Sequence, residues 1–220
     1  MRKGLFIAIE GPDGCGKSTQ IALLKETLEK QGYDVLLTRE PGGTALGEEI
    51  RKLLLLGREK VSPYCELMLF EAARAQHVME VLRPALAAGK IIIASRYADA
   101  TRAYQGGGRG LPLEEVKKAN ELGTGGLWPD LTVILDIDSE EGLRRVRGCG
   151  KDALGKDLPP GELDRIEAES LDFHRRVREE YLKLALEEKE RCKVIDGSRS
   201  REEVAREIRE LVLEIIKSNA

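Results

Sequence analysis

The sequence predicts a three-layer α/β fold in which a five-stranded parallel sheet is flanked by helices on both faces. Short, nearly continuous apolar runs alternate along the 220-residue chain with longer segments of helical periodicity. Such runs, rather than strict apolar/polar alternation, are typical of parallel strands that are buried on both faces. We therefore expect right-handed crossovers to join the strands.

The expected strands are the apolar runs of the chain, which cover residues 5–9, 35–37, 91–94, 131–137 and 193–195. Between the first two runs, Ile21, Leu24 and Leu28 lie on one face of a predicted helix, and Gly32 ends that helix. Further helices are expected over residues 46–56 and 63–88, with a possible kink at Pro84.

The last predicted helix has a recognisable start. Ser200 and Glu203 have the spacing of a capping box, in which each side chain accepts a hydrogen bond from the other residue's backbone N–H. Apolar residues then recur every three or four positions and form one stripe, which we expect to pack on the sheet. That stripe consists of Val204, Ile208, Leu211 and Ile215.

Composition indicates one compact domain over residues 1–220. With 41% hydrophobic and 34% charged residues, the chain resembles neither a disordered nor a membrane protein. A net charge of -3 gives no overall basic character, so small-molecule substrates are favoured over nucleic acid. Four widely spaced cysteines, and no apolar stretch of signal-peptide or membrane-spanning length, favour reduced thiols and a cytoplasmic location; Cys15 and Cys149 are expected to be exposed.

The most informative motif is Gly-Pro-Asp-Gly-Cys-Gly-Lys-Ser-Thr at residues 11–19. It follows a predicted strand and precedes a predicted helix, which is the context of a phosphate-binding loop. Its glycines permit a tight turn whose N–H groups point at phosphate oxygens, and Lys17 adds a positive charge. The Ser18 hydroxyl is of the kind that holds Mg²⁺. The predicted nucleoside triphosphate contacts are Gly11, Pro12, Asp13, Gly14, Cys15, Gly16, Lys17, Ser18 and Thr19.

A second unusual segment covers residues 144–165 and is rich in glycine, proline and positive charge. We interpret it as a flexible lid that closes over the triphosphate and supplies cations to the charge that develops during phosphoryl transfer. The alternative is a solvated linker.

Five further strings occur in a characteristic order. They are Thr38-Arg-Glu-Pro-Gly-Gly-Thr44, Phe70-Glu-Ala-Ala-Arg74, Ala103-Tyr-Gln-Gly-Gly-Gly-Arg-Gly110, Trp128-Pro-Asp-Leu-Thr132 and Glu162-Leu-Asp-Arg-Ile-Glu167. Together with the glycine loop, they closely resemble bacterial thymidylate kinases over about residues 5–197. The resemblance implies the fold of P-loop nucleoside triphosphatases.

The resemblance also implies roles for individual residues. Phe70 would stack on the thymine ring, and Arg74, four residues later on the same helical face, would hydrogen-bond the base. Arg39 and Arg96, which follow apolar strands, would hold the acceptor phosphate. Asp13 would face the deoxyribose and this phosphate, and the thymidine pocket would also include Thr101, Tyr104 and Gln105. The residues alone leave open that Phe70 is core and that the arginines are surface charges.

Two comparisons with the family concern the phosphates. The loop contains no arginine, so the resemblance assigns the catalytic arginines to the lid, where Arg145 and Arg147 are the candidates. Ser95 stands where the family usually has an aspartate that organises Mg²⁺. The metal would then depend on Ser18, Glu167, the phosphates and water.

These expectations describe a homodimeric enzyme that uses MgATP to phosphorylate dTMP to dTDP. Two alternatives remain at this point. A kinase for another nucleoside monophosphate would keep the loop and the lid. A GTPase-type switch is less favoured, because the chain has no Asn-Lys-x-Asp string and its Asp-x-x-Gly match at residues 152–155 lies in the polar lid.

Overall fold

A computed structural model describes residues 4–57, 60–149 and 163–218. The described residues include one sheet of five parallel strands in the order β2-β3-β1-β4-β5, which confirms the predicted fold class. All five predicted apolar runs form strands, with bounds that differ from the expected ones by one or two residues. The strands are β1 (Leu5–Glu10), β2 (Val35–Arg39), β3 (Ile91–Ser95), β4 (Leu131–Asp136) and β5 (Cys192–Asp196).

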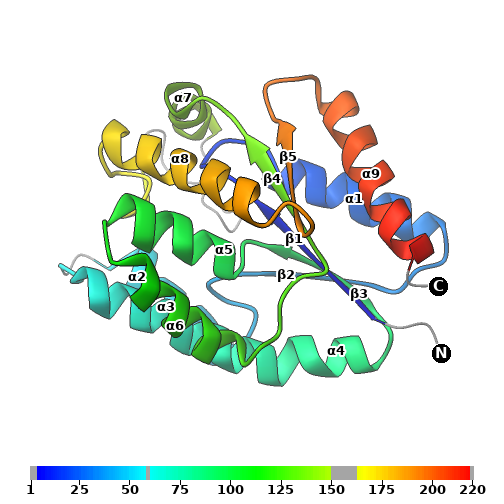
Figure 1. The fold of residues 1–220 in the computed structure, drawn as a ribbon, viewed down its shortest axis with the longest axis horizontal. Coiled ribbons are helices and arrows are strands. Elements are labelled where there is room, and N and C mark those ends of the chain that lie inside the picture. The colour runs from blue at the N-terminus through cyan, green and yellow to red at the C-terminus, as the bar shows by residue number, and fades with distance from the viewer. Residues whose placement is uncertain (1–3, 58–59, 150–162, 219–220) are drawn as a thin grey trace.

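Helices cover both faces of this sheet (Figure 1). One face packs against α1 (Lys17–Lys30) and α9 (Arg201–Ser218), which contact each other and share a buried cluster with alternate residues of the strands. The opposite face packs against helical segments within residues 78–104 and 171–187 through strand residues such as Phe6, Ile92 and Ile134. Adjacent residues of β1 therefore contribute to different cores, which is the period-2 geometry of a doubly covered strand.

The remaining helices lie on the lower and left sides of Figure 1, except that the helix over residues 139–149 lies at the top. Their bounds are α2 (Ala45–Leu55), α3 (Pro63–His77), α4 (Arg83–Ala87), α5 (Ala98–Thr101), α6 (Leu113–Thr124), α7 (Ser139–Cys149) and α8 (Leu171–Glu187). The predicted helix over 63–88 is therefore interrupted. A π-helical turn, Val78–Leu82, precedes α4, which has Pro84 in its first turn. Because proline lacks an N–H, the backbone adjusts just before it.

One glycine-rich segment is helical. Arg102–Gly108 forms a π-helical segment that continues α5, although three of its seven residues are glycine. Its glycines permit close packing on α8, because a Cβ at Gly108 would lie 2.5 Å from Cε2 of Phe173. Tertiary contact with α8 therefore holds this segment in helical form.

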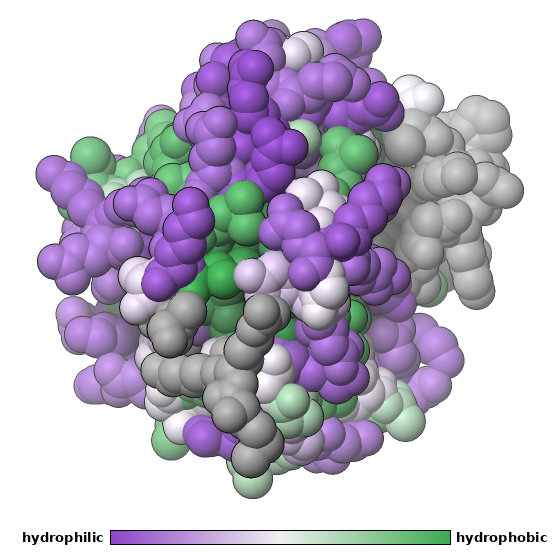
Figure 2. All heavy atoms as spheres, turned by 90° about the vertical axis from the view of Figure 1, so that its right-hand side faces the viewer, coloured by the Kyte–Doolittle hydropathy of each residue, from purple (hydrophilic) through white to green (hydrophobic). Residues whose placement is uncertain are grey.

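The predicted capping box is confirmed at the start of α9. The Ser200 N–H donates to the Glu203 carboxylate over 3.1 Å, and the Glu203 N–H donates to the Ser200 hydroxyl over 3.3 Å. No helix in the described part of the chain is long and apolar enough to cross a membrane. Figure 2 shows the side of the molecule from which both chain ends emerge, and hydrophilic residues cover most of that face around a small apolar centre.

Candidate active site

The glycine loop lies between β1 and α1, and its conformation explains its glycines. Gly11, Gly14 and Gly16 have φ values of 132°, 76° and 95°, which side-chain-bearing residues rarely adopt. Two of these glycines are also closely packed. A Cβ at Gly11 would lie 2.3 Å from the Leu135 carbonyl oxygen, and one at Gly14 would lie 2.1 Å from that of Gly142. The loop is therefore both sharply turned and held against β4 and α7.

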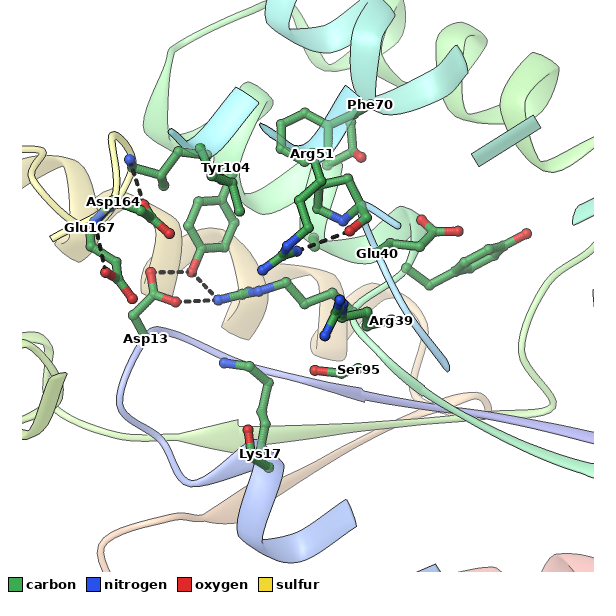
Figure 3. A pocket seen from close by; sticks show the side chains of 18 of the residues that line it. Asp13, Lys17, Arg39, Glu40, Arg51, Phe70, Ser95, Tyr104, Asp164 and Glu167 are labelled. Atoms are coloured by element: carbon green, nitrogen blue, oxygen red, sulfur yellow. Dashed lines mark hydrogen bonds and ion pairs between the residues drawn. The ribbon is translucent and has the colours of Figure 1, made fainter. Parts of the chain in front are cut away.

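Lys17 is the first residue of α1 and extends over this loop (Figure 3). Its ammonium group donates to the carbonyl oxygens of Gly11 and Pro12 over 3.0 and 2.9 Å. Ser18 and Thr19 follow in the first helical turn, where free backbone N–H groups and the helix dipole attract anions. Cys15, which we expected to be exposed, is only 3% exposed and belongs to the core below the loop.

Two arginines stand at the carboxyl ends of neighbouring strands. Arg39 ends β2 and is paired in register with Ser95, the last residue of β3, so Arg96 follows directly beside it. The Arg39 guanidinium donates to both carboxylate oxygens of Glu48, at 3.3 and 3.1 Å. Its Nε is buried and lacks a hydrogen-bond partner among the described residues. This atom is therefore a candidate donor to a bound phosphate.

Arg96 is the centre of a polar network. It adopts a φ of 68°, an uncommon conformation for a residue with a side chain. Its guanidinium donates to the carboxylate of Asp13, to the Gly11 carbonyl oxygen at 3.1 Å, and to the hydroxyls of Tyr104 and Tyr181 at 2.7 and 3.2 Å. The network thus ties β3 to the glycine loop and to the second helical layer.

The charge of Asp13 follows from the same network. Burial by itself would raise the pKa of this carboxyl, but the charges of Arg96 and Lys17 outweigh burial and lower the pKa below its ordinary value. The Tyr104 hydroxyl donates to Asp13 over 2.8 Å and favours the ionised form further. Asp13 is therefore a carboxylate at neutral pH, close to two cations of the site.

A second pair of carboxyls, Asp164 and Glu167, lies on the opposite side of Asp13 from Lys17 in Figure 3. The Asp164 side chain accepts from the N–H groups of Ile166 and Glu167 at 2.8 and 2.9 Å, which fixes this turn. Burial and the neighbouring Asp164 charge raise the pKa of Glu167 to about 7, so Glu167 retains a proton more readily than an ordinary glutamate.

These groups and the predicted base-binding residues line one cavity of about 380 Å³. Phe70 is half-buried beside it, and Arg74 is only 1% exposed but reaches its wall. Phe70 therefore contacts the cavity as well as the core, and the alternative of a purely core residue does not apply. Predicted residues that line the cavity are Asp13, Gly14, Gly16, Lys17, Ser18, Thr19, Arg39, Phe70, Arg74, Arg96, Thr101, Tyr104, Gln105, Arg145 and Glu167. Predicted residues outside the lining are Gly11, Pro12, Cys15 and Arg147.

The predicted lid over 144–165 needs a correction at both ends. Residues 144–149 are the last part of α7, so Arg145 and Arg147 lie on a helix rather than in a loop. Arg145 lines the cavity and donates to Glu141 over 2.8 Å, whereas Arg147 is exposed. Residues 163–165 are described and form the start of the turn that Asp164 stabilises. The rest of the expected lid, residues 150–162, lies outside the described residues.

Sequence reasoning missed several site residues. Arg51 is 5% exposed, lines the cavity and donates to the Pro41 carbonyl oxygen over 2.9 Å. It shares a face of α2 with the buried Leu54, three residues later, so a charge on an apolar helical face was an available signal. His174, which is 1% exposed, has its Nδ1 atom 4.0 Å from the Asp13 carboxylate. No sequence pattern connects that histidine with residue 13, because only the packing of α8 brings them together.

Comparisons with known proteins agree with this geometry. A family model described as thymidylate kinase matches residues 9–208. The thymidylate kinase of Halothermothrix orenii is 50% identical over 206 residues, covering 94% of this chain and 95% of the relative. That of Pelobacter propionicus is 49% identical over 212 residues, covering 96% and 94%. A crystal structure of thymidylate kinase from Ehrlichia chaffeensis superposes with a TM-score of 0.76 at 32% identity, covering 96% of this chain and 99% of the other.

Proposed function

We propose, since this chain belongs to the thymidylate kinase family, that it transfers the terminal phosphoryl group of MgATP to dTMP and releases ADP and dTDP. An oxygen of the dTMP 5′-phosphate attacks the γ-phosphorus, and the bond from that phosphorus to the oxygen bridging to the β-phosphate breaks. The observation that carries the proposal is the shared cavity. The phosphate-binding loop, two strand-end arginines and the Phe70/Arg74 pair line it together.

The residues divide into three groups by chemistry. Lys17 and the N-terminus of α1 hold the ATP phosphates, and Arg39 and Arg96 hold the acceptor phosphate against charge repulsion. Phe70, Arg74, Thr101, Tyr104 and Gln105 bind the nucleoside. Arg145 is the described arginine of α7 that can reach the transferring phosphoryl group, where a fixed cation favours the transition state over the ground state.

The donors at the cavity suit Mg²⁺. The Ser18 hydroxyl, the Asp13 carboxylate and Glu167 are hard oxygen ligands on its wall. No cluster of three or more acidic, histidine or cysteine side chains arranged for a metal occurs among the described residues. An Mg²⁺ ion that arrives with ATP keeps waters and phosphate oxygens as most of its ligands. Bound with ATP, Mg²⁺ neutralises phosphate charge. Ser18 and Glu167 would hold it.

The test is an ADP-release assay with MgATP and each of dTMP, dUMP, dCMP and AMP. The proposal expects ADP release to be fastest with dTMP, by a wide margin over dCMP and AMP. Equal or higher rates with another monophosphate would instead identify a different nucleoside monophosphate kinase. Nucleotide-dependent partner binding without any phosphorylation would support the alternative of a GTPase-type switch. The Asp-x-x-Gly match of that alternative, at residues 152–155, lies outside the described residues.

We further propose that the enzyme is a cytoplasmic homodimer that assembles through α2 and α3. Leu46 and Leu53, seven residues apart on α2, are 52% and 58% exposed, and Met68 on α3 is 56% exposed. The two helices pack against each other, and large exposed apolar side chains commonly mark an interface. Light scattering should give a dimer mass for the wild type and a monomer mass for a Leu53→Glu/Met68→Glu double variant. The matched control is Leu186→Glu on α8, where the wild-type leucine is 68% exposed; this variant should remain dimeric. A monomeric wild type would contradict the proposal.

A further inference from the structure

Arg74 is a charged side chain held almost completely within the protein. Its Nε donates to Glu40 over 2.8 Å, one Nη donates to the Glu71 carboxylate and to the Asn120 amide oxygen at 2.8 Å, and the other Nη donates to the Thr101 hydroxyl at 2.8 Å. Its guanidinium carbon also lies 5.3 Å from the centre of the Tyr97 ring. A guanidinium has five N–H donors. The contacts made by described residues therefore leave one of them, on the Nη atom that contacts Thr101.

The partners of Arg74 are themselves fixed. The second oxygen of Glu40 contacts Nδ1 of His77 over 3.0 Å, and Nε2 of that buried histidine lies 2.6 Å from the Thr38 hydroxyl. The Asn120 amide donates to the Ala98 carbonyl oxygen over 3.0 Å. These contacts fix the plane of the guanidinium from β2, α3 and α6 at once.

Close packing of α3 and α6 makes this possible. A Cβ at Gly123 would lie 1.9 Å from Oε2 of Glu71, so a larger residue there would displace the Glu71 carboxylate that holds Arg74. Asn120 lies one turn earlier on the same helix, and its side chain reaches the guanidinium because the two helices are this close. The asparagine is 4% exposed, so its interactions are internal rather than with solvent.

We infer that Asn120, together with Glu40 and Glu71, is a positioning residue that fixes Arg74 so that it presents a single donor to the base and thereby excludes pyrimidines with an amino group at position 4. This inference rests on the proposed function and names its base specificity. Thymine and uracil carry a carbonyl oxygen at position 4 and accept from the free N–H. Cytosine carries an amino group there, and two opposed donors leave both groups without a partner in a desolvated pocket.

The exclusion depends on the guanidinium being unable to turn away. The Asn120 amide oxygen is one of two acceptors for the same Nη atom of Arg74. If Arg74 is released on its Asn120 side, it can rotate, and its free N–H then no longer opposes an amino group at position 4. Loss of Asn120 should therefore improve the relative use of dCMP, although that residue lies behind Arg74.

The experiment measures kcat/KM with dTMP, dUMP and dCMP for the wild type, Asn120→Leu and Asn120→Asp. Leucine removes the acceptor, whereas aspartate keeps an oxygen for Arg74. We expect the dTMP/dCMP ratio to fall at least about tenfold in Asn120→Leu and to stay close to wild type in Asn120→Asp. The dTMP/dUMP ratio, which reports the 5-methyl group, should not change in either. Glu121→Gln, the next residue on α6, is the control and should leave both ratios unchanged.

Two results would overturn the inference: an unchanged dTMP/dCMP ratio in Asn120→Leu, or the same loss of discrimination in Asn120→Asp. A purely structural role would lower kcat/KM for all three nucleotides alike and leave the ratios constant, which also overturns it. If Asn120→Leu does not fold, Asn120→Ala provides the same comparison. Calorimetric binding of dTMP and dCMP gives the discrimination ratio without turnover, so a protein that binds dTMP selectively but releases no ADP contradicts the proposed function and not this inference.

Discussion

The contact between the glycine loop and α7 gives a prediction with an internal set of controls. Gly14 and Gly142 face each other across this contact: a Cβ at Gly14 would lie 2.1 Å from the Gly142 carbonyl oxygen, and one at Gly142 would lie 2.3 Å from that of Asp13. Backbone atoms cannot rotate away as side chains do. An alanine at either position must therefore push α7 and the loop apart. Gly16 has a φ of 95° but no atom within 4 Å of its Cβ position.

The three glycine-to-alanine variants separate two physical effects. Gly16→Ala has only the left-handed backbone and should cost about 1–2 kcal/mol of unfolding free energy. Gly142→Ala has only the steric contact. Overpacking should cost about 3 kcal/mol, and the higher helix propensity of alanine should return about 1 kcal/mol, so the unfolding free energy should fall by about 2 kcal/mol. Gly14→Ala combines both effects and should lose about 4 kcal/mol, a decrease in Tm of about 8–16 °C for a domain of this size.

The assay is urea and thermal unfolding of each variant without nucleotide, followed by the ADP-release rate with dTMP. Because α7 carries Arg145 beside the cavity, displacement of α7 should also reduce turnover in Gly142→Ala. A Gly142→Ala protein as stable and active as the wild type would refute the packing argument. Equal stability losses in Gly14→Ala and Gly16→Ala would show that the backbone conformation alone matters.

Three further predictions concern charge. Lys17→Ala should fold normally and lose turnover at least about a hundredfold, with Lys25→Ala on the same helix as control; unchanged turnover would exclude a role for the ammonium group. Ser95→Asp should lower the Mg²⁺ concentration for half-maximal rate, and no change in that concentration or in rate would contradict a role for residue 95 in organising the metal. Burial, and next the Asp99 charge, raise the pKa of Glu10 from 4.5 to about 7. The folded state then binds more protons than the unfolded state between these pH values, so wild-type stability should fall by up to about 3 kcal/mol from pH 4.5 to above 7. In urea unfolding, Glu10→Gln should remove most of that decrease. An equal decrease in both proteins would contradict the assignment of the pH dependence to Glu10.

The fold class was accessible from sequence because buried parallel strands are local features. Runs such as Leu5–Ile9 and Ile91–Ala94 are apolar over their whole length, and both form strands within one residue of the predicted end. The helix over residues 102–108 was not accessible, because glycine favours loops locally and only packing on α8 makes a helix there. The helices α6, α7 and α8 were also not predicted.

The site divides in the same way. Its motif residues, from the glycine loop to Arg74 and Arg96, were identified from strings that the family shares, and most of them line one cavity. Their roles remain predictions. The partners that set their orientation, such as Glu40 and Asn120 around Arg74, were not identified, because these residues are 34 and 46 positions away from it in the sequence.

The sequence by itself determined the phosphate-binding loop, since its glycines, Lys17 and Ser18 are adjacent in the chain and their chemistry requires only a preceding strand and a following helix. Tertiary structure alone decided what fixes the side chains around it: the network of Arg96 with Asp13 and Tyr104, and the helical placement of Arg145 on α7. The physical reason is distance along the chain. Local propensity specifies a turn or a strand, whereas the orientation of a buried charge depends on partners that only the packing of separate helices and strands brings within hydrogen-bond range.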